Sequence, residues 1–146
     1  MTDIPTLRPP HETPPVTDLA ALTEHWRALM GPLGSSCSRL WLLFLEADGA
    51  AVPDITTIDE IPARADPVGC ENLAQIAAHV LAEGASFAVL LSRPGREPMN
   101  EADRSWARGL TAAAAALGVS MWPMHFANDR ELRVFAPDDL VRTALE

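Results

Sequence analysis

The chain has 146 residues, of which 48% are hydrophobic, and a formal net charge of −9 with an isoelectric point near 4.8. This length and apolar content are sufficient for one domain with its own core. The acidic excess disfavours a surface that binds nucleic-acid phosphates, and no apolar run approaches the roughly 20 residues of a membrane-spanning helix.

The composition also indicates a cellular compartment. The N-terminus has no basic segment followed by an apolar one, so no secretory signal is indicated and we expect a cytoplasmic protein. All eleven basic residues are arginine, which is typical of a high-GC, bacterial coding bias. Cys37 and Cys70 lie far apart without a CxxC pattern, so we expect two reduced cysteines that pack as apolar side chains rather than a disulfide or a zinc site.

The N-terminal part divides into an arm and a first helix. Residues 1–16 contain five prolines and few large apolar groups, which predicts a flexible arm followed by a single domain over residues 17–146. Apolar residues then recur every three to four positions, which predicts a helix that begins at Thr17 or Asp18 and ends at Gly31 and Pro32.

The middle of the chain predicts a hairpin and a helix. A nearly continuous apolar strand over 39–46, a turn at Asp48 and Gly49, and a more polar strand over 55–61 are typical of paired neighbours. A second amphipathic helix is predicted over 70–83, closed by Gly84.

The remaining elements complete an alternating order. We expect a buried strand over 86–93, a helix over 100–117, strands over 119–126 and 131–136, and a short helix over 137–146 that begins with Pro137. Helices that alternate with apolar strands and two hairpins predict an α/β fold, a three-layer sandwich with a mixed sheet and flanking helices.

The polar residues at the start of the third predicted helix can be interpreted as a helix cap or as part of a functional site. Asn100 precedes the helical pattern and Asp103 follows three residues later, which is the spacing of a capping box. The same aspartate could instead be a ligand in a functional site. The segment before it, "LLSRPGREPM", contains neither histidine nor cysteine.

This region resembles the core of the RadC-type JAB/MPN domain family, whose fold is similar to that of cytidine deaminases. The shared pattern is an apolar strand, a Pro-Gly loop, a second proline, a polar cap, an aspartate three residues later, and a helix ending in Leu-Gly-Val; it spans residues 39–136. The family carries His-x-His-Pro at the end of the strand, a loop of the type Ser-Gly-Asp-Pro-Thr-Pro, a serine, and then an aspartate; its two histidines and the aspartate bind zinc. In this chain, Leu91, Ser92, Arg93 and Pro94 occupy the His-x-His-Pro positions, Asn100 the serine position and Asp103 the aspartate position.

The resemblance therefore implies a degenerate member of that family. Leu91 cannot bind a metal and the charge of Arg93 would repel one, and the loop is one residue shorter than the pattern. His79 and His125 have no second ligand at short spacing, so we expect each to be structural. We predict no metal, no cofactor and no catalytic residue; Pro94, Asn100 and Asp103 are what remains of the motif.

Four arginines give a second hypothesis. Arg93 and Arg96 lie in the loop, and Arg104 and Arg108 lie one turn apart on the following helix, so they could converge near a helix N-terminus and bind a phosphate or carboxylate. The alternative is that they pair with nearby acids on a solvated face. Those acids are Glu97, Glu101 and Asp103.

Three functions remain open from the sequence. The first is a non-catalytic protein-binding or scaffolding module, with the proline-rich arm as a docking segment. The second is a hydrolase or transferase on an anionic substrate held by the arginines, with Asp103 or His125 as acid or base. The third is an accessory protein of DNA repair that acts through a partner rather than by direct DNA contact. A protein partner is expected, and self-association is left open.

Overall fold

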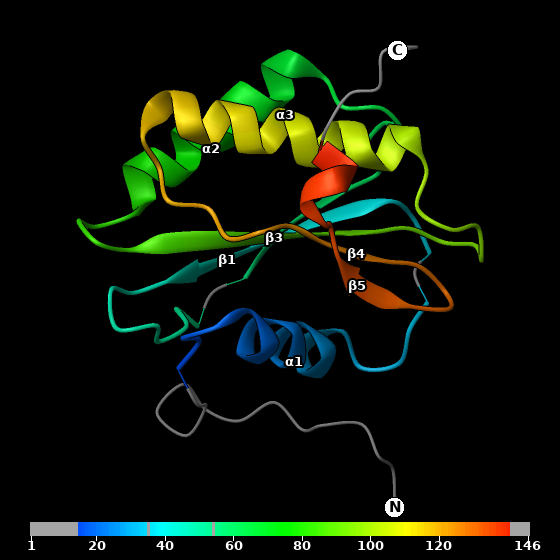
Figure 1. Ribbon diagram of the computed structural model, residues 1–146, viewed down its shortest axis with the longest axis horizontal. Coiled ribbons are helices and arrows are strands. Elements are labelled where there is room, and N and C mark those ends of the chain that lie inside the picture. The colour runs from blue at the N-terminus through cyan, green and yellow to red at the C-terminus, as the bar shows by residue number, and fades with distance from the viewer. Residues whose placement is uncertain (1–14, 35, 54, 141–146) are drawn as a thin grey trace, which may run out of the picture.

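The computed structural model describes residues 15–34, 36–53 and 55–140, which form a five-stranded mixed sheet with helices on both of its faces (Figure 1). The strands lie in the order β2-β1-β3-β4-β5. β3 and β4 are parallel, and the other three neighbouring pairs are antiparallel. The strands are β1 (Arg39–Leu45), β2 (Thr56–Asp59), β3 (Ser86–Ser92), β4 (His125–Ala127) and β5 (Leu132–Val134). The predicted α/β class, the mixed sheet and both hairpins are confirmed.

Three α-helices cover the sheet. α1 (Leu19–Met30) lies on one face, whereas α2 (Pro67–Val80) and α3 (Glu101–Leu117) lie together on the other (Figure 1). A short 3-10 helix, η1 (Pro137–Leu140), contacts α3. No helix within the described ranges is long and apolar enough to cross a bilayer.

The alternation of side chains along β1 explains why both faces of the sheet are covered. Leu40, Leu42 and Phe44 belong to the core under α2 and α3, whereas Leu43 and Leu45 pack in the core under α1. Successive side chains of a strand point to opposite faces, so a continuous apolar run needs a cover on each side. The unbroken apolar run that predicted this strand is therefore the reason for the two helical covers.

The packed part of the chain begins earlier than predicted. Val16, placed in the arm by the sequence, is 2% exposed, and its amide donates to the Gly49 carbonyl at 2.8 Å. Gly49 has a φ of +90°, and a Cβ there would lie 2.5 Å from the Val16 carbonyl oxygen. Residues 1–14 of the predicted arm and residues 141–146 of the predicted last helix lie outside the described residues.

Several predicted boundaries are wrong. α2 starts at Pro67 rather than at Cys70, because the Asp66 side chain caps it and proline suits its first position; it ends at Val80 rather than at Glu83. The next residue, Leu81, is extended and packs against the core. The strand predicted over 119–126 is interrupted at Pro123, which has no amide to donate: Met121 forms an isolated bridge with Phe87, and β4 runs from His125 to Ala127.

Candidate functional site

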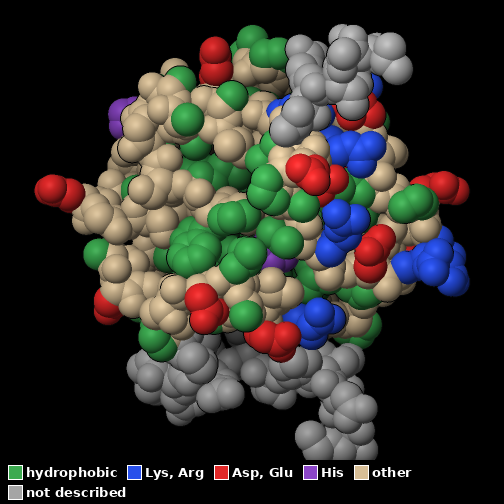
Figure 2. Space-filling view, viewed as in Figure 1, with side chains coloured by type: hydrophobic (Ala, Val, Ile, Leu, Met, Phe, Trp, Pro, Cys, Tyr) green, Lys and Arg blue, Asp and Glu red, His purple; other side chains and the backbone are tan. Residues whose placement is uncertain are grey.

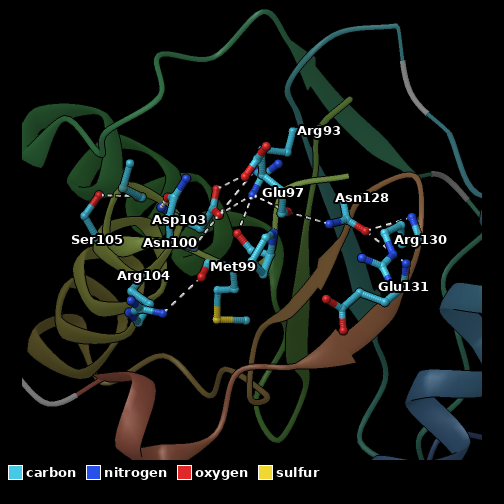
Figure 3. Close-up of polar contacts among 12 residues, drawn as sticks. Arg93, Glu97, Met99, Asn100, Asp103, Arg104, Ser105, Asn128, Arg130 and Glu131 are labelled. Carbon is cyan, nitrogen blue, oxygen red and sulfur yellow. Dashed lines mark hydrogen bonds and ion pairs between the residues drawn. The ribbon is translucent and has the colours of Figure 1, made fainter. Parts of the chain in front are cut away.

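An ion pair between Arg93 and Asp103 joins the end of β3 to the first turn of α3 (Figure 3). Arg93 Nε lies 3.0 Å from Asp103 Oδ1, and Nη2 lies 2.9 Å from Oδ2. The side chains are 14% and 5% exposed. This two-point contact between a guanidinium and a carboxylate is the strong, directional form of the interaction.

The same guanidinium organises the loop between β3 and α3. Arg93 Nη2 donates to the carbonyl oxygens of Glu97 and Pro98, each at 3.0 Å, and its charged carbon lies 5.0 Å from the centre of the Phe126 ring. Asn128, 2% exposed, donates its amide to the Glu97 carbonyl at 2.7 Å from the other side of the loop. Arg93 and Asn128 together hold the loop against the end of the sheet.

The capping box predicted for α3 is present, and it uses the same carboxylate. The Asp103 amide donates to Asn100 Oδ1, and the Asn100 amide donates to Asp103 Oδ2, both at 2.9 Å. Both Asp103 oxygens also accept from Arg93. The cap and the ion pair are therefore one unit, and Asp103 has little remaining capacity to bind anything else.

The positions that carry the family resemblance converge in space. Leu91, Arg93, Asn100 and Asp103 line one cavity of about 70 Å³. Since a water molecule takes about 30 Å³ of liquid, the cavity has room for about two waters and not for an organic substrate. Pro94, which with Asn100 and Asp103 is what remains of the motif, is exposed and does not line the cavity.

The four arginines do not share one site. Arg104 Nε lies 3.4 Å from a Glu101 oxygen, and Arg108 also contacts the Glu101 carboxylate. Arg96 is exposed in the loop. Arg93, Arg104 and Arg108 thus each contact a carboxylate, so an external anion would have to compete with these acids.

The candidate acid–base groups lie on opposite faces of the sheet. His125 of β4 is fully buried on the α1 side, where its Nε2 lies 2.7 Å from Thr23 Oγ1, whereas Asp103 lies on α3. Burial lowers the pKa of His125 to about 4, so the ring is neutral at pH 7. His79 is exposed on α2. Within the described ranges, no three His, Cys, Asp or Glu side chains gather as a metal would require.

Sequence reasoning missed the clamping roles of Arg93 and Asn128. An Asn-Asp pair directly after a strand is a turn signal, and Asn128 Oδ1 does accept from the amides of Arg130 and Glu131 at 2.9 Å. Nothing in the spacing indicated that its amide would reach Glu97, 31 residues away. That contact depends on β3 and β4 being neighbours in the sheet.

The surface carries charges of both signs. On the face shown in Figure 2, arginines and acidic side chains alternate along one side, while hydrophobic side chains gather beside them. On this face there is no patch of one sign that would follow a nucleic-acid backbone. No protein-family model matches the chain, and no curated protein matches it. The functional assignment therefore depends on the residues and geometry described above.

Proposed function

We propose that the chain is a three-layer JAB/RadC-like domain without metal chemistry, and that it acts as a non-catalytic protein-binding or scaffolding module. One observation carries this proposal. The three positions that would hold zinc in the resembled family, occupied here by Leu91, Arg93 and Asp103, line the same small cavity. Leu91 and Arg93, two residues apart at the end of β3, share one side of the strand, and the following loop returns Asp103 in the first turn of α3 to the same place.

The residues present do not fit a zinc ion. Catalytic zinc sites use three protein ligands, and here one carboxylate stands beside a leucine and an arginine. The guanidinium supplies next to Asp103 a fixed positive charge, which is the electrostatic role a cation would have had. The ion pair thus supports a domain that keeps the architecture of the site and has lost its reaction.

Protein binding is the function best compatible with this arrangement. The Asp103 carboxylate is occupied by Arg93, the cavity of about 70 Å³ beside it is too small for an organic substrate, and the net charge of −9 disfavours nucleic acid. The proline-rich residues 1–14 suit the docking of an extended segment on a partner, because proline lowers the entropy lost on binding.

The test is affinity capture with two matched baits. One bait is the full chain; the other has residues 1–14 replaced by a Gly/Ser sequence of equal length, which leaves the buried Val16 in place. We expect a protein retained by the first bait and lost from the second, and retained by an Arg96→Ala variant. Turnover of an anionic substrate that requires Arg96 would instead support the enzyme alternative.

A further inference from the structure

α1 covers one face of the sheet alone, whereas α2 and α3 share the other face (Figure 1). The buried apolar side chains accordingly form two separate cores, one on each face of the sheet. The smaller core packs Leu22 and Trp26 of α1 against strand residues such as Leu43 and Leu90; we call it the α1-side core. Among the described residues, the larger core contains none from α1, so it can stay packed when α1 moves away.

Within the described ranges, a single side-chain hydrogen bond links α1 to the sheet. His125 of β4 is fully buried, and its Nε2 lies 2.7 Å from Oγ1 of Thr23 on α1. The Thr23 hydroxyl donates to the Leu19 carbonyl at 3.0 Å, so its oxygen accepts from the imidazole, and the ring proton is on Nε2. Nδ1 is then the unprotonated nitrogen, and it is buried without a hydrogen bond.

The groups that surround this ring are uncharged. Its neighbours in the sheet are Leu90 of β3 and Val134 of β5, and Thr23 faces it from α1. The Pro123 carbonyl favours the protonated ring, but burial outweighs it and lowers the pKa of His125 to about 4. The pocket around the ring is therefore built for the neutral imidazole.

The charged and titratable groups of the neighbouring elements point away from the ring. On α1, Glu24 and Arg27 are exposed and pair with each other, and His25 lies on the other flank of the helix. On β5, Arg133 points to the opposite face of the sheet, where it pairs with Asp139. A proton on the imidazole would therefore have no counter-charge in the described part of the chain.

We propose that α1 is an acid-released lid: protonation of His125 at Nδ1 puts an uncompensated charge into the α1-side core, and α1 then leaves the sheet while the larger core stays packed. Release brings the imidazolium into water and exposes apolar strand residues that α1 covers, Leu43 and Leu90 among them. The pKa of His125 rises from about 4 in the closed state to its ordinary value of 6.5 in the released state. Acid therefore favours release, and the effect develops as the pH falls from about 6.5 to about 4. The lid does not depend on the proposed protein-binding function.

Amide hydrogen exchange at several low urea concentrations tests the lid. The protection factors of the α1 amides should fall about 30-fold between about pH 7.5 and pH 5, because the released state binds the proton more tightly. Global unfolding also exposes His125, so this pH dependence does not by itself identify a lid. The distinguishing result is that α1 amides are at least about tenfold less protected than α3 amides at both pH values, and respond less to urea because less surface is exposed.

Three variants separate the proton from the contact. His125→Gln keeps a donor for Thr23 but cannot be protonated, so most of the pH dependence of α1 protection should be lost. Thr23→Val removes the contact and keeps the imidazole, so α1 should be less protected near pH 7.5 and should still lose protection in acid. His25→Gln is the matched control, and most of the pH dependence should remain.

Two results would overturn the proposal. In the first, α1 and α3 amides of the wild-type chain are equally protected at every pH, which would mean that α1 leaves only when the whole domain unfolds. In the second, the pH dependence of α1 protection survives in His125→Gln. The wild-type measurement decides the first point even if a variant fails to fold.

Discussion

Replacing Arg93 should destabilise the domain far more than replacing any exposed arginine. The Arg93→Met variant keeps most of the apolar stem and removes the guanidinium, leaving the Asp103 carboxylate, 5% exposed, without its counter-charge. Breaking one partner of a buried pair costs about 3–5 kcal/mol, because the remaining charge is still desolvated. The carbonyl oxygens of Glu97 and Pro98 also lose a donor.

Arg104 provides the matched control. It follows Asp103 in the first turn of α3 and pairs with Glu101, but the Arg104 and Glu101 side chains are 31% and 32% exposed. Exposed ion pairs contribute about 0–1 kcal/mol. Arg104→Met should therefore lower the free energy of unfolding by less than about 1 kcal/mol.

Urea denaturation followed by circular dichroism measures both variants. We expect the urea concentration at the unfolding midpoint to fall strongly for Arg93→Met and only slightly for Arg104→Met. The slope of the unfolding free energy against urea concentration should not change. Adding Asp103→Asn to Arg93→Met should restore part of the loss, because the uncompensated charge is then gone. If the unfolding free energy of Arg93→Met stayed within about 1 kcal/mol of the wild-type value, the ion pair would not organise this end of the sheet.

Three further predictions concern groups away from this pair. Because burial lowers the pKa of His125 to about 4 from 6.5, the unfolded chain binds the proton more tightly, so unfolding free energy should fall by about 2 kcal/mol between about pH 7.5 and pH 5. His125→Leu should remove this part of the pH dependence of the unfolding free energy. A variant whose unfolding free energy changes with pH as steeply as that of the wild type would refute the prediction. Gly49→Ala should lower the unfolding free energy by about 2 kcal/mol or more, since its Cβ would collide with the Val16 carbonyl; a melting temperature equal to wild type would show that the turn relaxes freely. Burial raises the pKa of Cys70 to about 11, so a thiol reagent near pH 8 should modify Cys37 and spare Cys70 in the folded chain, as mass spectrometry of peptides would reveal.

Local signals were sufficient to predict most elements of the fold. The apolar run of β1, the turn at Gly49 and the capping box at Asn100 and Asp103 each have a cause within a few residues of sequence. The start of α2 was wrong although its signals, Asp66 and Pro67, are local; the end of α2 and the bounds of β4 were wrong where a tertiary contact or a proline decided the backbone, as at Leu81 and Pro123.

The candidate site was predicted less completely. The sequence placed Arg93 and Asp103 near each other, and it proposed both an anion site and pairing with acids. Arg104 and Arg108 both contact Glu101 along α3, whereas Arg93 reaches Asp103 only because the fold returns the start of α3 to the end of β3. The burial of His125 under α1 was equally hidden, because its partner Thr23 is 102 residues away.

We propose above that Leu91, Arg93 and Asp103 occupy the positions of a lost metal site. The direct test is the zinc content, by elemental analysis, of the wild-type chain and of a Leu91→His/Arg93→His variant, both purified without chelator or affinity tag. We expect no zinc in the wild type and one zinc per chain in the variant, lost again when Asp103→Asn is added. Stoichiometric zinc in the wild type, or a folded variant that binds none, would contradict it.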